Sequence, residues 1–188
     1  MSKRPPLHYS FVGLCIGLNV SCSFIAQTFK LPIFLDSIGM ILCAVMVGPA
    51  WGAVSGIAGL GILSVLIAPF EIAYSFTAVT IAFSVYLFHR IGYMQTWPRT
   101  ILLAPLVGVV AAISSAPVTT YLFGGVSLAG TDAVTAFFTA TGRVLAHSVL
   151  LGGLATDPFD KLLQSIAAYS LLRVIPEHVR YHFPSLRS

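Results

Sequence analysis

The segment from Tyr9 to Phe29 constrains the fold most strongly, because it contains no acidic or basic residue over 21 positions. As a helix it would be ~30 Å long at ~1.5 Å per residue, which matches the hydrocarbon core of a bilayer. A cleaved signal sequence has a shorter apolar region and a small-residue exit site, and this segment has neither. We therefore predict a retained membrane-spanning helix at 9–29.

Further apolar segments follow along most of the chain. We predict spans at 36–47, 50–67, 72–89 and 100–121, and one more span after them. Only 9% of the residues are charged, whereas a soluble domain carries about 25%. So few charges could not cover a water-exposed surface. The sequence thus predicts an all-α fold, a single integral membrane domain over residues 1–188 with six transmembrane helices.

The position of the last span is ambiguous, because two apolar segments remain, 133–154 and 158–175. Only one of them can cross if the basic tail is to be cytoplasmic, since each crossing changes the side of the membrane. In one arrangement 133–154 crosses and the following helix lies on the inner surface. In the other, 133–154 forms an outer hairpin or capping helix and 158–175 crosses. Asp157 as N-cap and Pro158 in the first turn favour the second arrangement.

The charges give the predicted spans an orientation. With a cytoplasmic N-terminus, most cations fall on the inner side, as the positive-inside rule requires. These inner cations are Lys3, Arg4, Arg90, Arg99, Arg173, Arg180 and Arg187. Lys30 falls on the outer side, and the sequence assigns Lys161 to neither side. Both termini are therefore expected in the cytoplasm, and the carboxylates gather at the outer mouth.

A group of polar and aromatic residues is predicted at this outer mouth. Asp36 stands at the start of a predicted helix, and Tyr74 lies one turn after Glu71. The group consists of Phe34, Asp36, Glu71, Tyr74, Tyr121, Phe123, Asp132, Asp160 and Lys161. Aromatic rings with a few fixed polar groups suit a vitamin-sized molecule. The alternative is that the acids only cap helices and that the rings form an interfacial belt.

Arg143 lies within an apolar segment, and His147 follows one turn later. A charge at the bilayer centre costs ~2.5–3.5 kcal/mol unless it is paired or hydrated. One interpretation is that Arg143 binds a substrate carboxylate or phosphate in a water-filled cavity. The other is an internal ion pair with Asp132 or Asp160, or a position outside the lipid. His147 is either a ligand contact or a buried histidine.

Motifs of enzymes and of nucleic-acid binders are absent from the sequence. It has no G-x-x-x-x-G-K-[ST] loop, so we do not expect it to hydrolyse ATP itself. Its cysteines, Cys15, Cys22 and Cys43, lack a metal-binding spacing and are expected to be small buried residues. The basic tail is too sparse for nucleic acid and suits anionic lipid. We expect no catalytic residue, metal site or cofactor; a haem or corrinoid ligand would need His147 or a cysteine.

Four short motifs carry a resemblance to a known family. LPIFLDSIG, followed by GPAWGAVSG, resembles the substrate-binding (S) components of energy-coupling factor (ECF) transporters, and VSLAGTD and DPFDKLL extend the resemblance. It implies high-affinity capture of a vitamin or similar micronutrient at the cell membrane of a bacterium or archaeon. It also implies delivery through a transmembrane coupling (T) protein and two cytoplasmic ABC ATPases. Loops matching 30–35, 68–71 and 122–132 would close over the substrate.

Gly13, Gly17 and Ser21 recur at every fourth position of the first predicted span. Small residues at this spacing form a ridge where another helix can approach closely. We therefore expect the coupling protein to dock on this ridge.

The chemical nature of the substrate stays open. The mixed charges predicted at the outer mouth suit a zwitterion or a neutral polar ring compound, without choosing among vitamins, their precursors and modified bases. Two other classes of function also remain. The chain would be a solitary small-molecule transporter or channel in the first, and a membrane sensor or assembly subunit that binds no substrate in the second.

Overall fold

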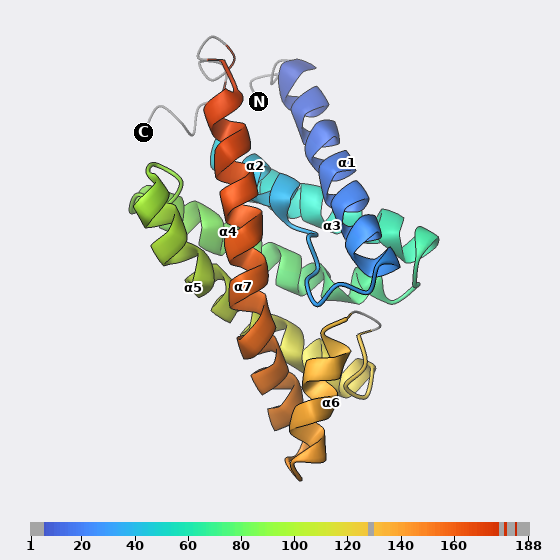
Figure 1. Ribbon diagram of the computed structural model, residues 1–188. Helices are drawn as coiled ribbons and strands as arrows, with labels where there is room; N and C mark the ends of the chain where they lie inside the picture. Colours follow the sequence, from blue (N-terminus) through green and yellow to red (C-terminus); the bar gives the residue numbers. More distant parts are fainter. Residues whose placement is uncertain (1–5, 128–129, 177–178, 180–182, 184–188) are drawn as a thin grey trace.

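The computed structural model describes residues 6–127, 130–176, 179 and 183. Within these residues the fold is all helical and contains no strand (Figure 1). The elements are α1 (Pro6–Thr28), α2 (Ile38–Met46), α3 (Pro49–Leu66), the 3-10 helix η1 (Glu71–Tyr74), α4 (Ser75–Arg90), α5 (Trp97–Pro117), the π-helical turn η2 (Val118–Leu122), α6 (Asp132–Ala140) and α7 (Leu145–Val174). The predicted all-α fold class is therefore confirmed.

Some of these helices are suited to a membrane. The segments long and apolar enough to cross one are Leu7–Thr28, Pro49–Leu66, Glu71–Arg90 and Trp97–Leu122. Large apolar side chains on them stand uncovered by the rest of the protein; Val65 of α3 is 86% exposed and Leu102 of α5 is 73% exposed. Extended apolar surface of this kind marks contact with a membrane or a partner rather than with water. The fold is thus compatible with a membrane-embedded protein.

The predicted span at 36–47 is instead a short helix at the centre of the fold. α2 has nine residues and is only ~14 Å long at ~1.5 Å per residue, too short to cross a bilayer alone. All of its residues are buried, and it packs against α1, α3, α4 and α7. The contact with α1 requires Gly39, since a Cβ there would lie 2.0 Å from the carbonyl oxygen of Cys15. The helix lengths therefore do not confirm six crossings.

The predicted break before residue 158 does not exist. α7 runs without interruption from Leu145 to Val174, so Asp157 is no N-cap and Pro158 lies in the helix interior. The apolar segment 133–154 is divided instead at a turn, where Gly142 has a positive φ of 80°. α6 precedes this turn and packs back against α7. Asp157 and Pro158 resemble the start of a helix in the sequence. The chain stays helical at these residues because α5 packs against α7 there.

The contact between α5 and α7 depends on Gly108. A Cβ at this position would lie 2.3 Å from Cα of Pro158 and 2.5 Å from its nitrogen. Both atoms belong to the backbone, so no side-chain rotation relieves the clash.

We expect Gly108→Ala to destabilise the protein by about 1–3 kcal/mol, the usual cost of overpacking a filled interior. Thermal unfolding of the detergent-purified protein measures this. Gly61→Ala in α3 is the matched control, because its Cβ would meet Ile72 at 3.7 Å, an ordinary contact. Equal melting temperatures of the two variants would show that α5 and α7 pack less closely than described.

Candidate small-molecule pocket

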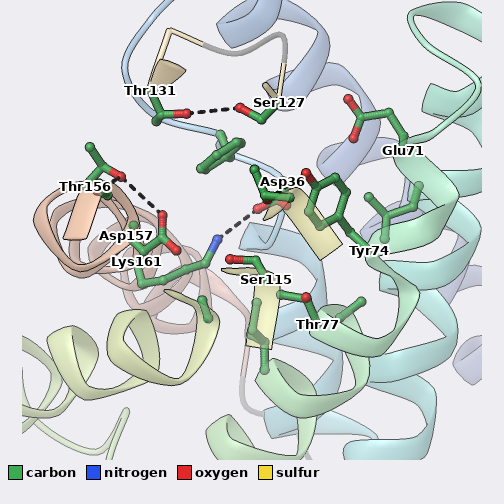
Figure 2. Close-up of a pocket in the computed structure, with 18 of the residues that line it drawn as sticks. Asp36, Glu71, Tyr74, Thr77, Ser115, Ser127, Thr131, Thr156, Asp157 and Lys161 are labelled. Atoms are coloured by element: carbon green, nitrogen blue, oxygen red, sulfur yellow. Dashed lines mark hydrogen bonds and ion pairs between the residues drawn. The ribbon is translucent and has the colours of Figure 1, made fainter. Parts of the chain in front are cut away.

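A pocket lies among α2, α3, α4, α5 and α7, and it is bordered by Phe34 and Asp36 of the segment before α2 and by Ser127 and Thr131 (Figure 2). The empty volume of the pocket, including the open solvent at its mouth, is about 970 Å³. Its polar lining residues are Gln27, Asp36, Glu71, Tyr74, Thr77, Ser115, Thr119, Ser127, Thr131, Asp132, Thr135, Thr156, Asp157 and Lys161. Its larger apolar lining residues are Phe34, Met40, Leu60, Ile81 and Val149. Apolar walls with a limited set of polar groups are typical of small-molecule sites.

Lys161 of α7 is the charged centre of one wall. Its ammonium nitrogen Nζ lies 2.9 Å from Oδ1 of Asp36 and 2.9 Å from Oδ2 of Asp160. It also donates to the hydroxyl of Ser37 at 3.1 Å. Lys161 is 2% exposed, so its charge has little access to solvent and depends on these carboxylates for its stabilisation.

The same part of α7 holds the arm that precedes α2. Oδ1 of Asp160 accepts hydrogen bonds from the backbone N–H groups of Phe34 at 3.0 Å and Leu35 at 3.2 Å. Oε1 of Gln164 accepts from the N–H of Ser37 at 2.6 Å. Leu35 has a positive φ of 53°, a conformation that costs a non-glycine residue roughly 1–2 kcal/mol. The side chains of α7 therefore fix the arm in a shape that it would not adopt alone, and the arm carries Phe34 and Asp36 to the pocket.

Asp36 is not the N-cap that its position in the sequence indicates. Ser37 occupies that place and makes no side-chain cap, while Oδ1 of Asn19 in α1 accepts from the N–H groups of Gly39 at 2.7 Å and Met40 at 3.1 Å. Asp36 is free to face Lys161 instead. Oδ1 of Asp36 lies 2.9 Å from the Lys161 ammonium and accepts a hydrogen bond from the Ser37 hydroxyl at 2.7 Å.

The wall opposite α7 comes from η1 and the start of α4. Glu71, Tyr74 and Thr77 recur every third residue and all line the pocket. The hydroxyl of Tyr74 lies 2.9 Å from that of Thr119 in η2, which fixes the ring. Phe123 does not line the pocket; it packs behind this wall, with its ring centre 5.8 Å from that of Tyr74.

Asp132 and Asp157 complete the acidic lining. Asp132, the first residue of α6, accepts from the backbone N–H of Ser127 at 2.8 Å and from the Ser127 hydroxyl. This ties the loop before α6 to the helix; residues 128–129 of the predicted closing loop lie outside the described part. Asp157 is 5% exposed, and its Oδ1 accepts a hydrogen bond from the hydroxyl of Thr156 at 3.3 Å. Figure 2 shows Asp157 and Glu71 on opposite sides of the pocket.

Some residues predicted for the site lie elsewhere. Asp160 contacts Lys161 and the arm from behind and does not line the pocket. Tyr121 is 82% exposed. Arg143 lies in the turn between α6 and α7 and is exposed, as is His147 in the first turn of α7. The segment around Arg143 is therefore no continuous apolar helix, and the turn at Gly142 places this charge outside the pocket without the need for an ion pair.

We expect Arg143→Ala to leave ligand retention unchanged, because its side chain does not reach the pocket. The measurement is the amount of small molecule that co-purifies with each variant, determined by mass spectrometry. Asp36→Ala is the comparison, since it removes a lining carboxylate and should reduce retention. A loss of ligand in Arg143→Ala would return this residue to the site.

Asp157 and most of the serine and threonine residues that line the pocket are not predicted from the sequence. Asp157 was hidden because its position next to Pro158 resembles the start of a helix. Its true signal is periodic. Val149, Gly152, Gly153, Thr156, Asp157 and Lys161 lie three or four residues apart on one face of α7, a pattern that becomes visible only when 145–174 is taken as one helix.

The sequence-predicted residues that line this pocket are Phe34, Asp36, Glu71, Tyr74, Asp132 and Lys161. They come from the arm, η1, α6 and α7, which are far apart in the chain. A comparison with protein-family models, curated proteins and solved structures finds no match to this chain.

Proposed function

We propose that this chain captures a small organic molecule from outside the cell and serves as the S component of an ECF-type importer. The pocket is the observation that supports this proposal. Four distant parts of the chain contribute the sequence-predicted residues that line it, and hydrogen bonds from α7 hold one of its bordering loops in place. A subunit with a purely structural role would not need such a cavity.

The distribution of charge supports an orientation with both termini in the cytoplasm. α1 begins and α7 ends at one end of the molecule, and α6 lies at the opposite end (Figure 1). Arg173 is in the last turn of α7, at the end that we assign to the cytoplasm. The predicted inner cations Lys3, Arg4, Arg180 and Arg187 lie outside the described residues. In this orientation, in the cell membrane of a bacterium or archaeon, the pocket opens toward the outside.

Six passes through the membrane belong to this proposal. Four are the long apolar helices α1, α3, α4 with η1, and α5 with η2. α7 is the fifth, and it is long enough at 30 residues. The sixth is α2 together with the arm before it, enclosed by the other helices so that its short length is not exposed to lipid.

Delivery of the molecule requires partners, because the chain has no nucleotide-binding loop. We propose a transmembrane coupling protein and two cytoplasmic ABC ATPases. The ridge of Gly13, Gly17 and Ser21 is exposed on α1, and a Cβ added at Gly13 or Gly17 would meet no atom within 4 Å. This leaves room for a helix of the coupling protein to approach closely.

Mass spectrometry of the purified protein tests the proposal. We expect a stoichiometric small molecule in the wild-type protein and a reduced amount in Asp36→Ala. Affinity purification from the native membrane then tests the partners, and we expect two ATPase subunits to accompany the chain. A bound molecule without ATPases would favour a solitary transporter, and the absence of any bound molecule would favour a sensor or assembly subunit.

A further inference from the structure

The pocket has the opposite charge to the rest of the chain. The protein has ten Lys and Arg residues against six Asp and Glu residues, a formal net charge of +4. The acidic residues that line the pocket are Asp36, Glu71, Asp132 and Asp157, and Asp160 lies directly behind them. Among the described residues, Lys161 is the one basic side chain in the lining.

The charge of Lys161 is already neutralised within the protein. Its ammonium lies 2.9 Å from a carboxylate oxygen of Asp36 and 2.9 Å from one of Asp160. Two carboxylates around one ammonium leave this group with a formal charge of −1. Lys161 is therefore a poor partner for the carboxylate or phosphate of a ligand.

Asp132 is held by hydrogen bonds from Ser127, so, of the side chains that the structure describes, the carboxyl groups left lining the cavity without an ion pair or a backbone donor are those of Glu71 and Asp157. They are 9% and 5% exposed, and no ion pair reaches either of them within the described part of the chain. Asp157 accepts a hydrogen bond from the Thr156 hydroxyl and lies one helical turn before Lys161, whose ammonium is already paired with Asp36 and Asp160. Gln27, which lines the pocket with Glu71, is neutral. A buried carboxylate without a cation is costly, so a positively charged ligand would relieve this cost.

Thr77 gives a second, independent indication of a ligand. Its side chain is 8% exposed and lines the pocket. Its hydroxyl oxygen has no hydrogen-bond partner, although nearly all buried polar atoms in proteins have one. Figure 2 shows Thr77 on the Glu71 side of the pocket, with its hydroxyl directed inward. A donor on the ligand would satisfy this oxygen.

We infer that the pocket binds an organic cation, a small molecule with a protonated amine whose N–H groups donate to Glu71 and the hydroxyl of Thr77, while the carboxyl group of Asp157 on the opposite wall (Figure 2) adds to the attraction for positive charge. The apolar part of the molecule would lie against Met40 and Ile81, which line the same cavity. The apolar part of the lining suits an organic cation. This inference rests on the proposed function, because it names the substrate class of that same site. It replaces the zwitterion or neutral compound that the sequence indicated.

Three probes of nearly equal shape test the sign of the charge. They are 2-phenylethylamine, which is a cation at neutral pH, the neutral 2-phenylethanol, and the anion phenylacetate. Each is titrated into the full-length protein in detergent, with thermal unfolding as the readout, and magnesium chloride serves as an inorganic cation. We expect the amine to stabilise the protein with an apparent affinity about tenfold or more above that of the alcohol, because hydrogen bonds between charged groups are stronger than those of a neutral hydroxyl. Phenylacetate and magnesium should have no effect. Equal or stronger stabilisation by any other probe overturns the inference, as does no stabilisation by the amine.

Two variants test the residues. Glu71→Gln and Asp157→Asn keep the shape of each side chain and remove its charge. Each should lower the affinity for the amine about tenfold and leave the affinity for the alcohol unchanged. Arg143→Gln, outside the pocket, is the control and should bind the amine as the wild type does. Loss of amine and alcohol affinity by the same factor in both pocket variants would indicate a structural role and overturn the assignment.

Failure of this inference and failure of the proposed function are distinguishable by combining binding with uptake. If cells expressing the chain import a neutral or anionic compound and the purified protein ignores the amine, the charge assignment is wrong and the importer remains. If the protein binds the amine and no uptake depends on ATPase subunits, the importer is wrong and the charge assignment stands.

Discussion

Lys161→Met is expected to be the most damaging single substitution in this protein. The change leaves Asp36 and Asp160 without the ammonium that lies 2.9 Å from each. Removing one partner of a buried ion pair typically costs about 3–5 kcal/mol, because the other charge is then buried alone. A protein of this kind has a total stability of about 5–15 kcal/mol. We therefore expect a large fall in melting temperature and loss of bound ligand, measured on the detergent-purified protein.

Two controls make the result specific to the charge. Arg143→Met removes an exposed basic residue and should change neither quantity. The triple variant Lys161→Met, Asp36→Asn and Asp160→Asn removes all three charges together, and the asparagine at 160 still offers an oxygen to the N–H groups of Phe34 and Leu35. We expect it to recover most of the lost stability. If Lys161→Met melts and binds as the wild type does, α7 does not hold the arm in the way described.

Gly17→Leu is expected to abolish uptake while leaving ligand binding intact. A Cβ at Gly17 meets nothing within 4 Å, and leucine is a better helix former than glycine by up to about 1 kcal/mol. The isolated protein should therefore fold and bind its ligand normally. In the importer the leucine would stand between α1 and the coupling protein, where overpacking costs about 1–3 kcal/mol, enough to reduce docking about tenfold or more.

Uptake in cells and ligand retention by the purified protein are measured in parallel for this variant. Ala155→Leu is the matched control, because Ala155 is also exposed on a helix, α7, but lies away from the ridge. It should support normal uptake. Retained uptake in Gly17→Leu would remove this face of α1 from consideration as a docking surface.

Several residues that the sequence predicts for the site line the pocket, and local chemistry explains why. A carboxylate within an apolar segment is costly in lipid, so the sequence predicts that Asp36, Glu71 and Asp132 lie at segment ends. Each lines the pocket. The aromatic residues were harder to place. Phe34 and Tyr74 face the cavity, but Tyr121 is exposed and Phe123 packs behind Tyr74, and composition does not separate these cases.

The sequence misplaced residues wherever a local signal was overridden by packing. Asp157 with Pro158 resembles a helix start, yet both lie within α7 because Gly108 of α5 allows close contact at this point. Asp36 resembles an N-cap, yet Asn19 from another helix supplies the cap for α2. In both cases the deciding partner lies far away in the sequence, where no local pattern reports it.

The sequence by itself determined that the chain is helical and apolar, because long segments with almost no charge have few other ways to satisfy their backbone. It also predicted that Asp36, Glu71 and Asp132 lie near the ends of segments, as they do. Only the tertiary structure decided that Lys161 pairs with Asp36 and Asp160, while Glu71 and Asp157 line the cavity and form no ion pair with another described residue. The reason is that the availability of a charged group for a ligand depends on the groups that surround it in space. Asp36 and Lys161 contact each other although they are more than 100 residues apart in the chain.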